Sequence, residues 1–130
     1  MRILLTGGSG DVGTLLAADL GRRGDHVVNI DMAPPRISGG TFINGSILDR
    51  HLLSRTMQGV DCVVHIAAWH GVHEKTKTPA EFHDLNVTGT FNVLQAAQEA
   101  GVRKFIFISS TSVADAHGLY GSSKLLGEKM

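Results

Sequence analysis

The sequence has little of several features that mark particular classes of protein. Its 130 residues include one cysteine, Cys62, which excludes an internal disulfide framework and a cysteine-based zinc cluster. We expect Cys62 to be a small buried apolar residue. Only 5% of the residues are aromatic, and 12 Lys and Arg residues balance 12 Asp and Glu residues. The chain therefore has no basic field for nucleic acid or for an anionic membrane surface.

Long apolar runs are also lacking. No segment approaches the ~20 residues that span a bilayer, and the chain passes from Arg2 into a short apolar stretch without a signal-peptide pattern. The only close pair among the histidines is His70 and His73, with Glu74 beside them and no third ligand at a useful spacing. We therefore expect no metal site, no membrane partner and a soluble cytoplasmic protein, in which the histidine pair belongs to a substrate-facing loop.

Glycine is plentiful, with 16 residues, many of them between short apolar segments. This pattern is typical of an α/β domain in which buried strands alternate with helices. The segments lack the polar alternation of half-exposed strands, which predicts parallel strands that are buried on both faces. The expected strands are residues 2–6, 26–31, 61–67 and 104–110, with a weaker one at 41–44.

Helices are expected between these strands. Apolar residues recur at helical spacing over residues 12–23, Asp49 can cap a helix to about residue 57, and a capping box opens a helix over residues 78–100. A last helix begins at about Gly121. Right-handed crossovers then predict a doubly wound parallel sheet, Rossmann-like, in one domain of residues 1–130.

A glycine-rich turn, TGGSGDVG at residues 6–13, joins the first strand to the first helix. At such a turn, backbone N–H groups and the positive helix end face a pyrophosphate. We expect Gly7 to make the tight turn, Gly10 to admit the phosphates, and Gly13 to let helix and strand pack. A P-loop is excluded because no lysine follows, and a nucleophile elbow because Asp11 replaces its last glycine. The expected cofactor contacts here are Gly7, Ser9, Gly10, Asp11, Val12 and Gly13.

An acidic residue, Asp31, ends the second strand eighteen residues beyond Gly13. There its carboxylate can accept hydrogen bonds from adenosine ribose hydroxyls, each worth roughly 1.5–3 kcal/mol, and it would repel a 2′-phosphate. NAD is therefore favoured over NADP as the cofactor, although Arg36 could meet a 2′-phosphate. The alternative for Asp31 is a solvated strand end without a ligand.

Five motifs in order along the chain carry a resemblance to a known family. They are the glycine turn, His65-x-Ala67-Ala68, Asn86, Ser109-Ser110 and Tyr120-x-x-x-Lys124. Together they resemble the short-chain dehydrogenase/reductase superfamily, and the first two resemble its extended branch, the NAD-dependent epimerase/dehydratase family. The resemblance covers essentially the whole chain. It implies a Rossmann fold, NAD, and sugars or nucleotide sugars as substrates.

Two of these residues suggest proton chemistry by themselves. Tyr120 and Lys124 are four apart on a predicted helix, so they share one face. A tyrosine ordinarily has a pKa near 10, and lowering it by about three units takes roughly 4 kcal/mol. Lys124 and oxidised nicotinamide are cations that can help to supply this. The alternative is a chance pair on a helix face. The resemblance implies that both residues also contact the cofactor, with Lys124 holding the nicotinamide ribose.

The remaining site residues follow from the resemblance. It implies that Ser110 orients the substrate oxygen and stabilises its developing charge, with Ser109 as second choice and a merely polar strand end as the alternative. Asn86 would anchor the site, or would lie on an ordinary polar face. Ala67 and Ala68 would keep the strand end thin where the cofactor passes.

The sequence departs from the family pattern at three places. Ser46, beside Ile47 at the expected adenine site, stands where many relatives carry an aspartate. Thr111 and Ser112 follow the serine pair where dehydratases carry Asp-Glu, which speaks against dehydratase chemistry. Only nine residues then lead from the serine pair to Tyr120, which leaves little room for a substrate loop.

Two further side chains have open roles. We expect His65 to be a strand histidine with satisfied hydrogen bonds. Trp69, which follows the fourth strand, lines the substrate pocket or packs in the core.

The combined expectation is an NAD-dependent epimerase or dehydrogenase that moves a hydride from a carbon bearing a hydroxyl. Tyr120 would take the proton, Ser110 would steady the oxygen, and Lys124 would support both tyrosine and cofactor. The alternatives are a dinucleotide-binding module without turnover, an inactive fragment and a structural interaction protein. The chain ends six residues after Lys124, so we expect the cofactor-binding portion of a longer enzyme, without the substrate-binding part, and a weak or altered homodimer.

Overall fold

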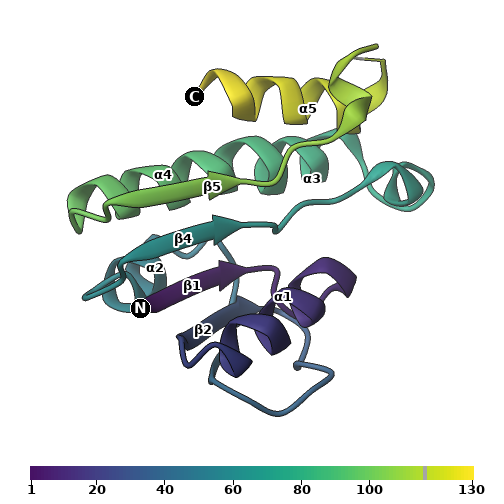
Figure 1. Ribbon diagram of the computed structural model, residues 1–130. Coiled ribbons are helices and arrows are strands. Elements are labelled where there is room, and N and C mark those ends of the chain that lie inside the picture. Colours follow the sequence, from purple (N-terminus) through teal and green to yellow (C-terminus); the bar gives the residue numbers. More distant parts are fainter. Residues whose placement is uncertain (116) are drawn as a thin grey trace.

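Five parallel strands form one sheet in the computed structural model, which describes residues 1–115 and 117–130 (Figure 1). Their order is β3-β2-β1-β4-β5, so the direction of winding reverses between β1 and β4. This is the doubly wound Rossmann-like order that was expected. The strands are β1 (Arg2–Thr6), β2 (His26–Asp31), β3 (Thr41–Asn44), β4 (Cys62–His65) and β5 (Lys104–Phe107).

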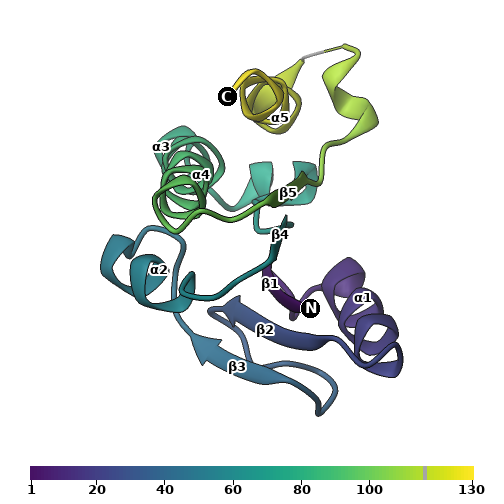
Figure 2. The same ribbon diagram turned by 60° about the vertical axis from the view of Figure 1, so that its left-hand side comes forward.

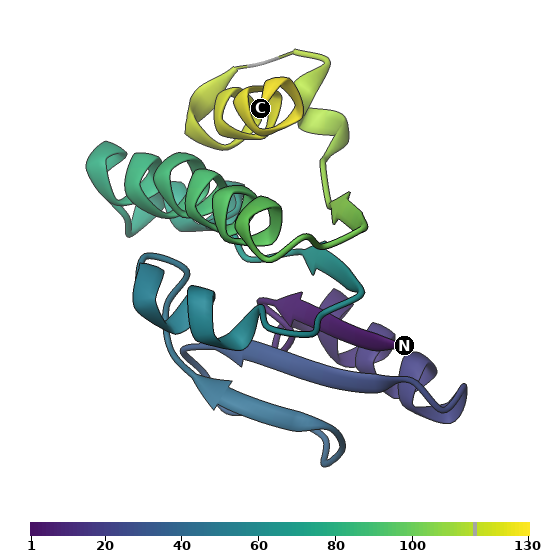
Figure 3. The same ribbon diagram turned by 90° about the vertical axis from the view of Figure 1, so that its left-hand side faces the viewer.

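Helices cover both faces of the sheet. One face carries α1, and α2, α4 and α5 follow one another along the other face (Figures 2 and 3). Within the described part of the chain, no helix has the length and apolarity that crossing a bilayer requires. The helical segments are α1 (Asp11–Arg22), α2 (Arg50–Thr56), η1 (Gly71–Lys75), α3 (Pro79–Phe82), η2 (His83–Gly89), α4 (Thr90–Glu99), η3 (Thr111–Val113) and α5 (Gly118–Lys129).

The core consists of two apolar layers because successive strand residues point to opposite faces. Leu4 and Val63 pack in the layer under α2 and α4. Leu5 and Cys62 pack in the layer under α1, where Cys62 is the small buried residue that was expected. The burial of β1 and β4 on both faces explains why these strands have continuous apolar sequences.

Two strands are shorter than their apolar runs predicted. The backbone N–H groups of Ile66 and Ala67 both donate to the carbonyl oxygen of Thr6, at 3.1 and 3.0 Å, so the chain bends out of the ladder after β4. Ile108 donates its N–H to the carbonyl oxygen of His65 at 3.0 Å, after which the chain leaves β5 and enters η3. The residues that were expected to extend these strands therefore lie at the carboxyl edge of the sheet.

The long helix after β4 is not α-helical throughout. Thr78 and Glu81 form the expected capping box, and the helix continues to Glu99, but its middle, η2, is a π-helix. The Thr90 hydroxyl donates to the Asn86 carbonyl oxygen at 2.6 Å, and both side chains are buried. These two buried polar side chains accompany a wider helix turn, which the apolar spacing alone did not indicate. The last helix, α5, begins three residues earlier than expected.

A buried histidine links β1, β4 and η2–α4. The Nδ1 atom of His65 lies 2.6 Å from the Thr6 hydroxyl, and its Nε2 atom lies 2.9 Å from the Thr90 hydroxyl. Because the Thr90 hydroxyl gives its own proton to Asn86, it accepts from Nε2–H, which assigns the Thr6 hydroxyl as the donor to Nδ1. Burial lowers the pKa of His65 to about 3. His65 is therefore a neutral strand histidine with both ring nitrogens satisfied, as expected.

This neutral imidazole predicts acid sensitivity. The pKa of His65 is about 3 in the folded chain against an ordinary 6.5, so the unfolded chain binds the proton first and stability is lost as the pH falls from about 6.5 toward 3. Between pH 7 and 5 the wild type should lose about 2 kcal/mol more than His65→Gln, which cannot titrate. Urea unfolding at both pH values measures this, and equal losses in the two proteins would contradict it.

Candidate functional site

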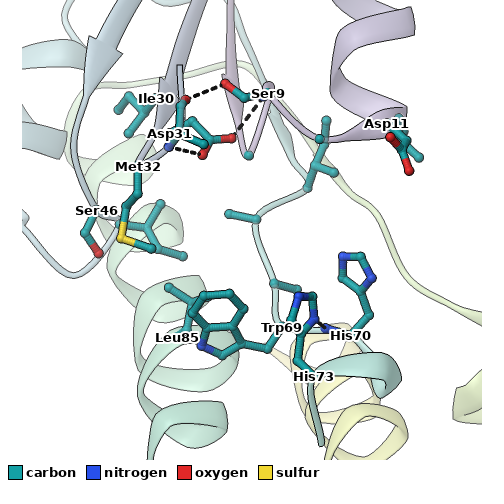
Figure 4. Close-up of a pocket in the computed structure, with 18 of the residues that line it drawn as sticks. Ser9, Asp11, Ile30, Asp31, Met32, Ser46, Trp69, His70, His73 and Leu85 are labelled. Atoms are coloured by element: carbon teal, nitrogen blue, oxygen red, sulfur yellow. Dashed lines mark hydrogen bonds between the residues drawn. The ribbon is translucent and has the colours of Figure 1, made fainter. Parts of the chain in front are cut away.

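A cleft of about 480 Å³ lies at the carboxyl ends of β1, β2 and β4 (Figure 4). This is the point where the strand order reverses, and doubly wound sheets bind ligands at such a point. The volume falls within the roughly 300–1,000 Å³ of small-molecule sites. The glycine turn, the end of β2, the segment after β3 and the segment after β4 supply its walls.

The glycine turn is packed so closely that side chains would not fit at two positions. Gly7 has a φ of +73°, and a Cβ there would lie 2.7 Å from the backbone of Ala67. A Cβ on Gly13 would lie 2.4 Å from the Cα of Gly8, so Gly13 allows α1 to lie close against the turn that follows β1. A Cβ on Gly10 would meet only the Gly7 carbonyl oxygen, at 3.5 Å. Gly10 lines the cleft, which leaves its backbone accessible to a ligand.

Asn29, which belongs to none of the sequence motifs, holds the glycine turn in place through hydrogen bonds from β2. Asn29 is buried in β2, where its Oδ1 accepts the Gly8 N–H at 2.9 Å and its Nδ2 donates to the Ser9 hydroxyl at 3.1 Å. A Cβ on Gly8 would lie 2.3 Å from this Oδ1. The sequence feature that could have indicated this role is a polar residue inside the apolar run HVVNID, at a position that the sheet buries.

Asp31 is fixed at the end of β2 and lines the cleft. One carboxylate oxygen accepts the Ser9 N–H and the other accepts the Ala33 N–H, both at 2.9 Å. Asp31 is therefore not a freely solvated strand end. Arg36, on the loop after β2, forms an ion pair with Asp11 at the first turn of α1. The guanidinium that could meet a 2′-phosphate thus already has a carboxylate partner.

The segment after β4 forms the opposite wall. Ala67 and Ala68 line the cleft, as do the rings of Trp69, His70 and His73, which gather at one end of it (Figure 4). The His73 ring centroid lies 5.1 Å from that of Trp69 and 4.8 Å from that of His70. Burial, then repulsion from His73 and Lys124, lowers the pKa of His70.

The adenine-site candidates are placed at the cleft as well. Ser46 and Ile47 line it beside the end of β2. No group of three metal-binding side chains gathers in residues 1–115 and 117–130.

Asn86 connects this wall to α5. Its side chain is 3% exposed, so it does not lie on an ordinary polar helix face. Its Oδ1 accepts the Trp69 N–H at 2.7 Å, and its Nδ2 donates to the Trp69 carbonyl at 2.8 Å and to the Ser123 hydroxyl at 2.9 Å. Ser123 in turn donates to the Tyr120 carbonyl at 2.8 Å. One asparagine therefore fixes both the cleft wall and the helix that carries Tyr120.

Tyr120 and Lys124 lie on one face of α5, as their spacing predicted. The Lys124 Nζ is 5.9 Å from the Tyr120 ring centroid and donates to the Ile108 carbonyl at 2.7 Å. The lysine is 4% exposed, and burial lowers its pKa to about 8. Neither residue is among the described residues that line the cleft. The Tyr120 ring lies next to it, because its centroid is 6.3 Å from that of His70, which does line the cleft.

The serine pair is split between two partners. Ser110 caps η3, where its hydroxyl accepts the Ser112 N–H and bonds the Ser112 hydroxyl, both at 3.1 Å. The Ser109 hydroxyl bonds Glu128 on α5. The structure therefore links Asn86 to Tyr120 through Ser123, places Lys124 beside the Tyr120 ring, and engages the Ser110 hydroxyl within η3.

A doubly wound sheet, a close-packed glycine turn at the reversal point and a fixed carboxylate at the end of the second strand together define a dinucleotide-binding domain. The model of the NAD dependent epimerase/dehydratase family matches residues 3–130. The chain belongs to this family.

Known relatives include proteins of two activities. A UDP-glucose 4-epimerase from Erwinia amylovora is 34% identical over the whole chain, which covers 47% of it. A 3 beta-hydroxysteroid dehydrogenase/Delta 5-->4-isomerase from Mycobacterium tuberculosis is 34% identical, with 86% of this chain and 32% of the relative covered. The structure of a UDP-glucose-4-epimerase from Stenotrophomonas maltophila, with bound NAD and formylated UDP-arabinopyranose, superposes with a TM-score of 0.90 at 30% identity and covers 99% and 47% of the two chains. The chain thus spans about half or less of their lengths.

Two glycines of α1 allow a matched test of the turn. Gly13→Ala places a Cβ against backbone and should cost about 1–3 kcal/mol of stability. Gly21→Ala, in the same helix, meets nothing within 4 Å and should stabilise the chain by about 0.5–1 kcal/mol. Urea unfolding of both variants measures the difference, and a Gly13→Ala chain as stable as Gly21→Ala would refute the close packing.

Proposed function

We propose that residues 1–130 form the NAD-binding Rossmann domain of an epimerase-type oxidoreductase. Its reaction would be hydride transfer at a hydroxyl-bearing carbon of a sugar or nucleotide sugar. The observation that carries this proposal is the juxtaposition of two features. The first is a cleft lined by the fixed Asp31 and the accessible Gly10. The second is the helix that carries Tyr120 and the buried Lys124, which lies beside the cleft residue His70. The family match and the NAD in the Stenotrophomonas structure support it.

We expect the residues of the cleft to hold a dinucleotide as follows. Backbone N–H groups of residues 11–13, in the first turn of α1, would hold the pyrophosphate, because the N–H groups of residues 7–10 already donate within the chain and no side chain shields the turn at Gly10. The Asp31 carboxylate would accept the adenosine ribose hydroxyls and disfavour a 2′-phosphate. The other contacts we propose are Ser9, Asp11, Val12, Ser46, Ile47, Ala67 and Ala68, all of which line the cleft.

Tyr120 would take the proton of the substrate hydroxyl. With a pKa of about 8, Lys124 is mostly charged at neutral pH, and its bond to the Ile108 carbonyl keeps that charge within 5.9 Å of the tyrosine ring centroid. A cation at this distance favours the phenolate. The nicotinamide supplies the hydride acceptor when it is bound. The Ser110 hydroxyl would give up its hydrogen bond to Ser112 and donate to the substrate oxygen instead. Asn86 would keep the helix of Tyr120 in place through its bond to Ser123.

The second candidate is a dinucleotide-binding module without turnover, such as a redox sensor or regulatory subunit. The lining of the cleft favours it, because Tyr120, Lys124 and Ser110 are not among the described residues that line the cleft. The burial of the lysine beside Tyr120 favours the enzyme, because a charge that has no function would be cheaper in solvent. Cofactor binding is common to both candidates, and turnover separates them.

Cofactor binding is tested by calorimetry. The wild type should bind NAD⁺ more tightly than NADP⁺, because the Asp31 carboxylate repels the added phosphate. Gly10→Val should abolish binding, because its side chain enters the cleft. Gly21→Val makes the same replacement at a site with nothing within 4 Å and should retain binding. If the Gly10 variant binds as well as the wild type, the cofactor assignment fails.

Turnover is tested on a panel of sugars and nucleotide sugars, by NADH formation from NAD⁺ for a dehydrogenase and by interconversion of sugar epimers for an epimerase. The enzyme hypothesis predicts activity that Tyr120→Phe removes, because the ring stays and only the phenolic proton acceptor is lost. Full activity in Tyr120→Phe would discard the proposed base. NAD⁺ binding with neither NADH formation nor epimer interconversion on the panel would favour the module.

A further inference from the structure

The segment after the cleft wall carries a carboxylate whose partner lies far along the chain. Glu74 stands beside His73 in η1, the segment that the sequence predicted to be a substrate-facing loop. Its side chain turns instead toward α5, where Oε1 accepts the backbone N–H of Tyr120 at 3.0 Å across 46 residues of sequence. Glu74 therefore contacts the helix turn that carries the proposed base.

This bond replaces the usual cap of a helix. The first N–H groups of a helix have no partner within it, and an N-cap side chain ordinarily accepts the N–H of the second or third residue. The N-cap residue of α5 is His117, which makes no such bond, and Tyr120 is the third residue of the helix. Glu74 accepts this N–H from another element, and its negative charge suits the positive end of the helix.

A glycine gives the carboxylate its access. Gly118 has a φ of +75°, and a Cβ there would lie 3.0 Å from Oε1 and 3.3 Å from Oε2 of Glu74. Any other residue at this position would be strained and would crowd the carboxylate. Gly118 and Tyr120, both in the first turn of α5, therefore each lie against the Glu74 carboxylate.

The segment that presents Glu74 is itself held at the cleft. The His70 N–H donates to His73 Nδ1 at 3.1 Å, and the His73 N–H donates to the His70 carbonyl at 2.8 Å. Just before them, both backbone groups of Trp69 are bonded to Asn86. A displacement of α5 relative to this segment would therefore break the Glu74 bond.

We propose that Glu74 is a positioning residue, which fixes the first turn of α5, and with it Tyr120, against the cleft wall of residues 69–73. The role of this placement in proton transfer rests on the proposed function, whereas the placement itself does not. The competing explanation is that Glu74 only adds stability to a helix end.

The chain has one tyrosine, so protein labelled with fluorotyrosine gives one fluorine NMR signal that reports on Tyr120 alone. In the wild type this signal should be displaced from its position in the unfolded chain. In Glu74→Ala it should move toward the unfolded position, and hydrogen exchange of the Tyr120 amide should accelerate roughly tenfold. Glu74→Gln should restore both, because its side-chain oxygen accepts the same bond.

Glu81→Ala is the matched control. It removes the same charge and another capping bond, that from the Thr78 N–H at 2.8 Å, but from α3. Its Tyr120 signal and amide exchange should match the wild type. Unchanged values in Glu74→Ala, or equal changes in Glu81→Ala, would overturn the proposal. Glu74→Asp, which keeps the charge and shortens the reach, is the milder variant should the alanine chain not fold, and it should also accelerate exchange at Tyr120.

Adding NAD⁺ to the labelled proteins separates this proposal from the proposed function. Binding should shift the Tyr120 signal in the wild type and in Glu74→Gln, and should shift it less in Glu74→Ala. If NAD⁺ does not bind the wild type while the Glu74 variants behave as expected, the proposed function fails and the positioning role stands. If NAD⁺ binds and shifts the signal of Glu74→Ala as fully as that of the wild type, positioning by Glu74 is refuted.

Discussion

A neutral imidazole between two threonine hydroxyls is the interaction on which the site depends. His65 joins the end of β1 to the long helix through Thr6 and Thr90, and each of its ring nitrogens has one hydrogen-bond partner. Leaving a buried polar group of this kind without its partner costs about 1–3 kcal/mol. The bonds continue from Thr90 to Asn86, whose side chain holds the cleft wall and α5. The strand before the glycine turn and the helix of the proposed base are thus parts of one hydrogen-bonded network.

Burial acts on two basic side chains of this region with different results. His65 has a pKa of about 3 and stays neutral, so it serves as a fixed donor and acceptor. Lys124 has a pKa of about 8, because burial lowers its pKa from a much higher ordinary value, and it keeps most of its charge at neutral pH. The same low-polarity surroundings therefore give one structural imidazole and one cation, which lies beside the ring of Tyr120.

Local patterns in the sequence predicted the parts of the site that depend on neighbouring residues. The apolar runs located all five strands, the glycine spacing located the turn at Gly7, and a separation of four placed Tyr120 and Lys124 on one helix face. Asn29, the partners of His65 and the bond from Glu74 were not predicted. Each joins elements separated by 20 to 60 residues of sequence, and no local pattern carries the register that brings them together. The engagement of Ser110 by Ser112 was missed for another reason, since four adjacent hydroxyl residues offer equivalent bonds.

The sequence alone determined the class of fold and the family, because strand burial, helix periodicity and glycine turns are set by short segments whose chemistry is readable residue by residue. Tertiary structure decided how the polar side chains are used. Asn86, for which an ordinary polar helix face was the alternative, is a buried link, and Glu74, in the expected substrate-facing loop, caps a distant helix. The reason is that a buried or capping polar group is defined by its partner, and only the packing of η1 and η2 against α5 supplies that partner.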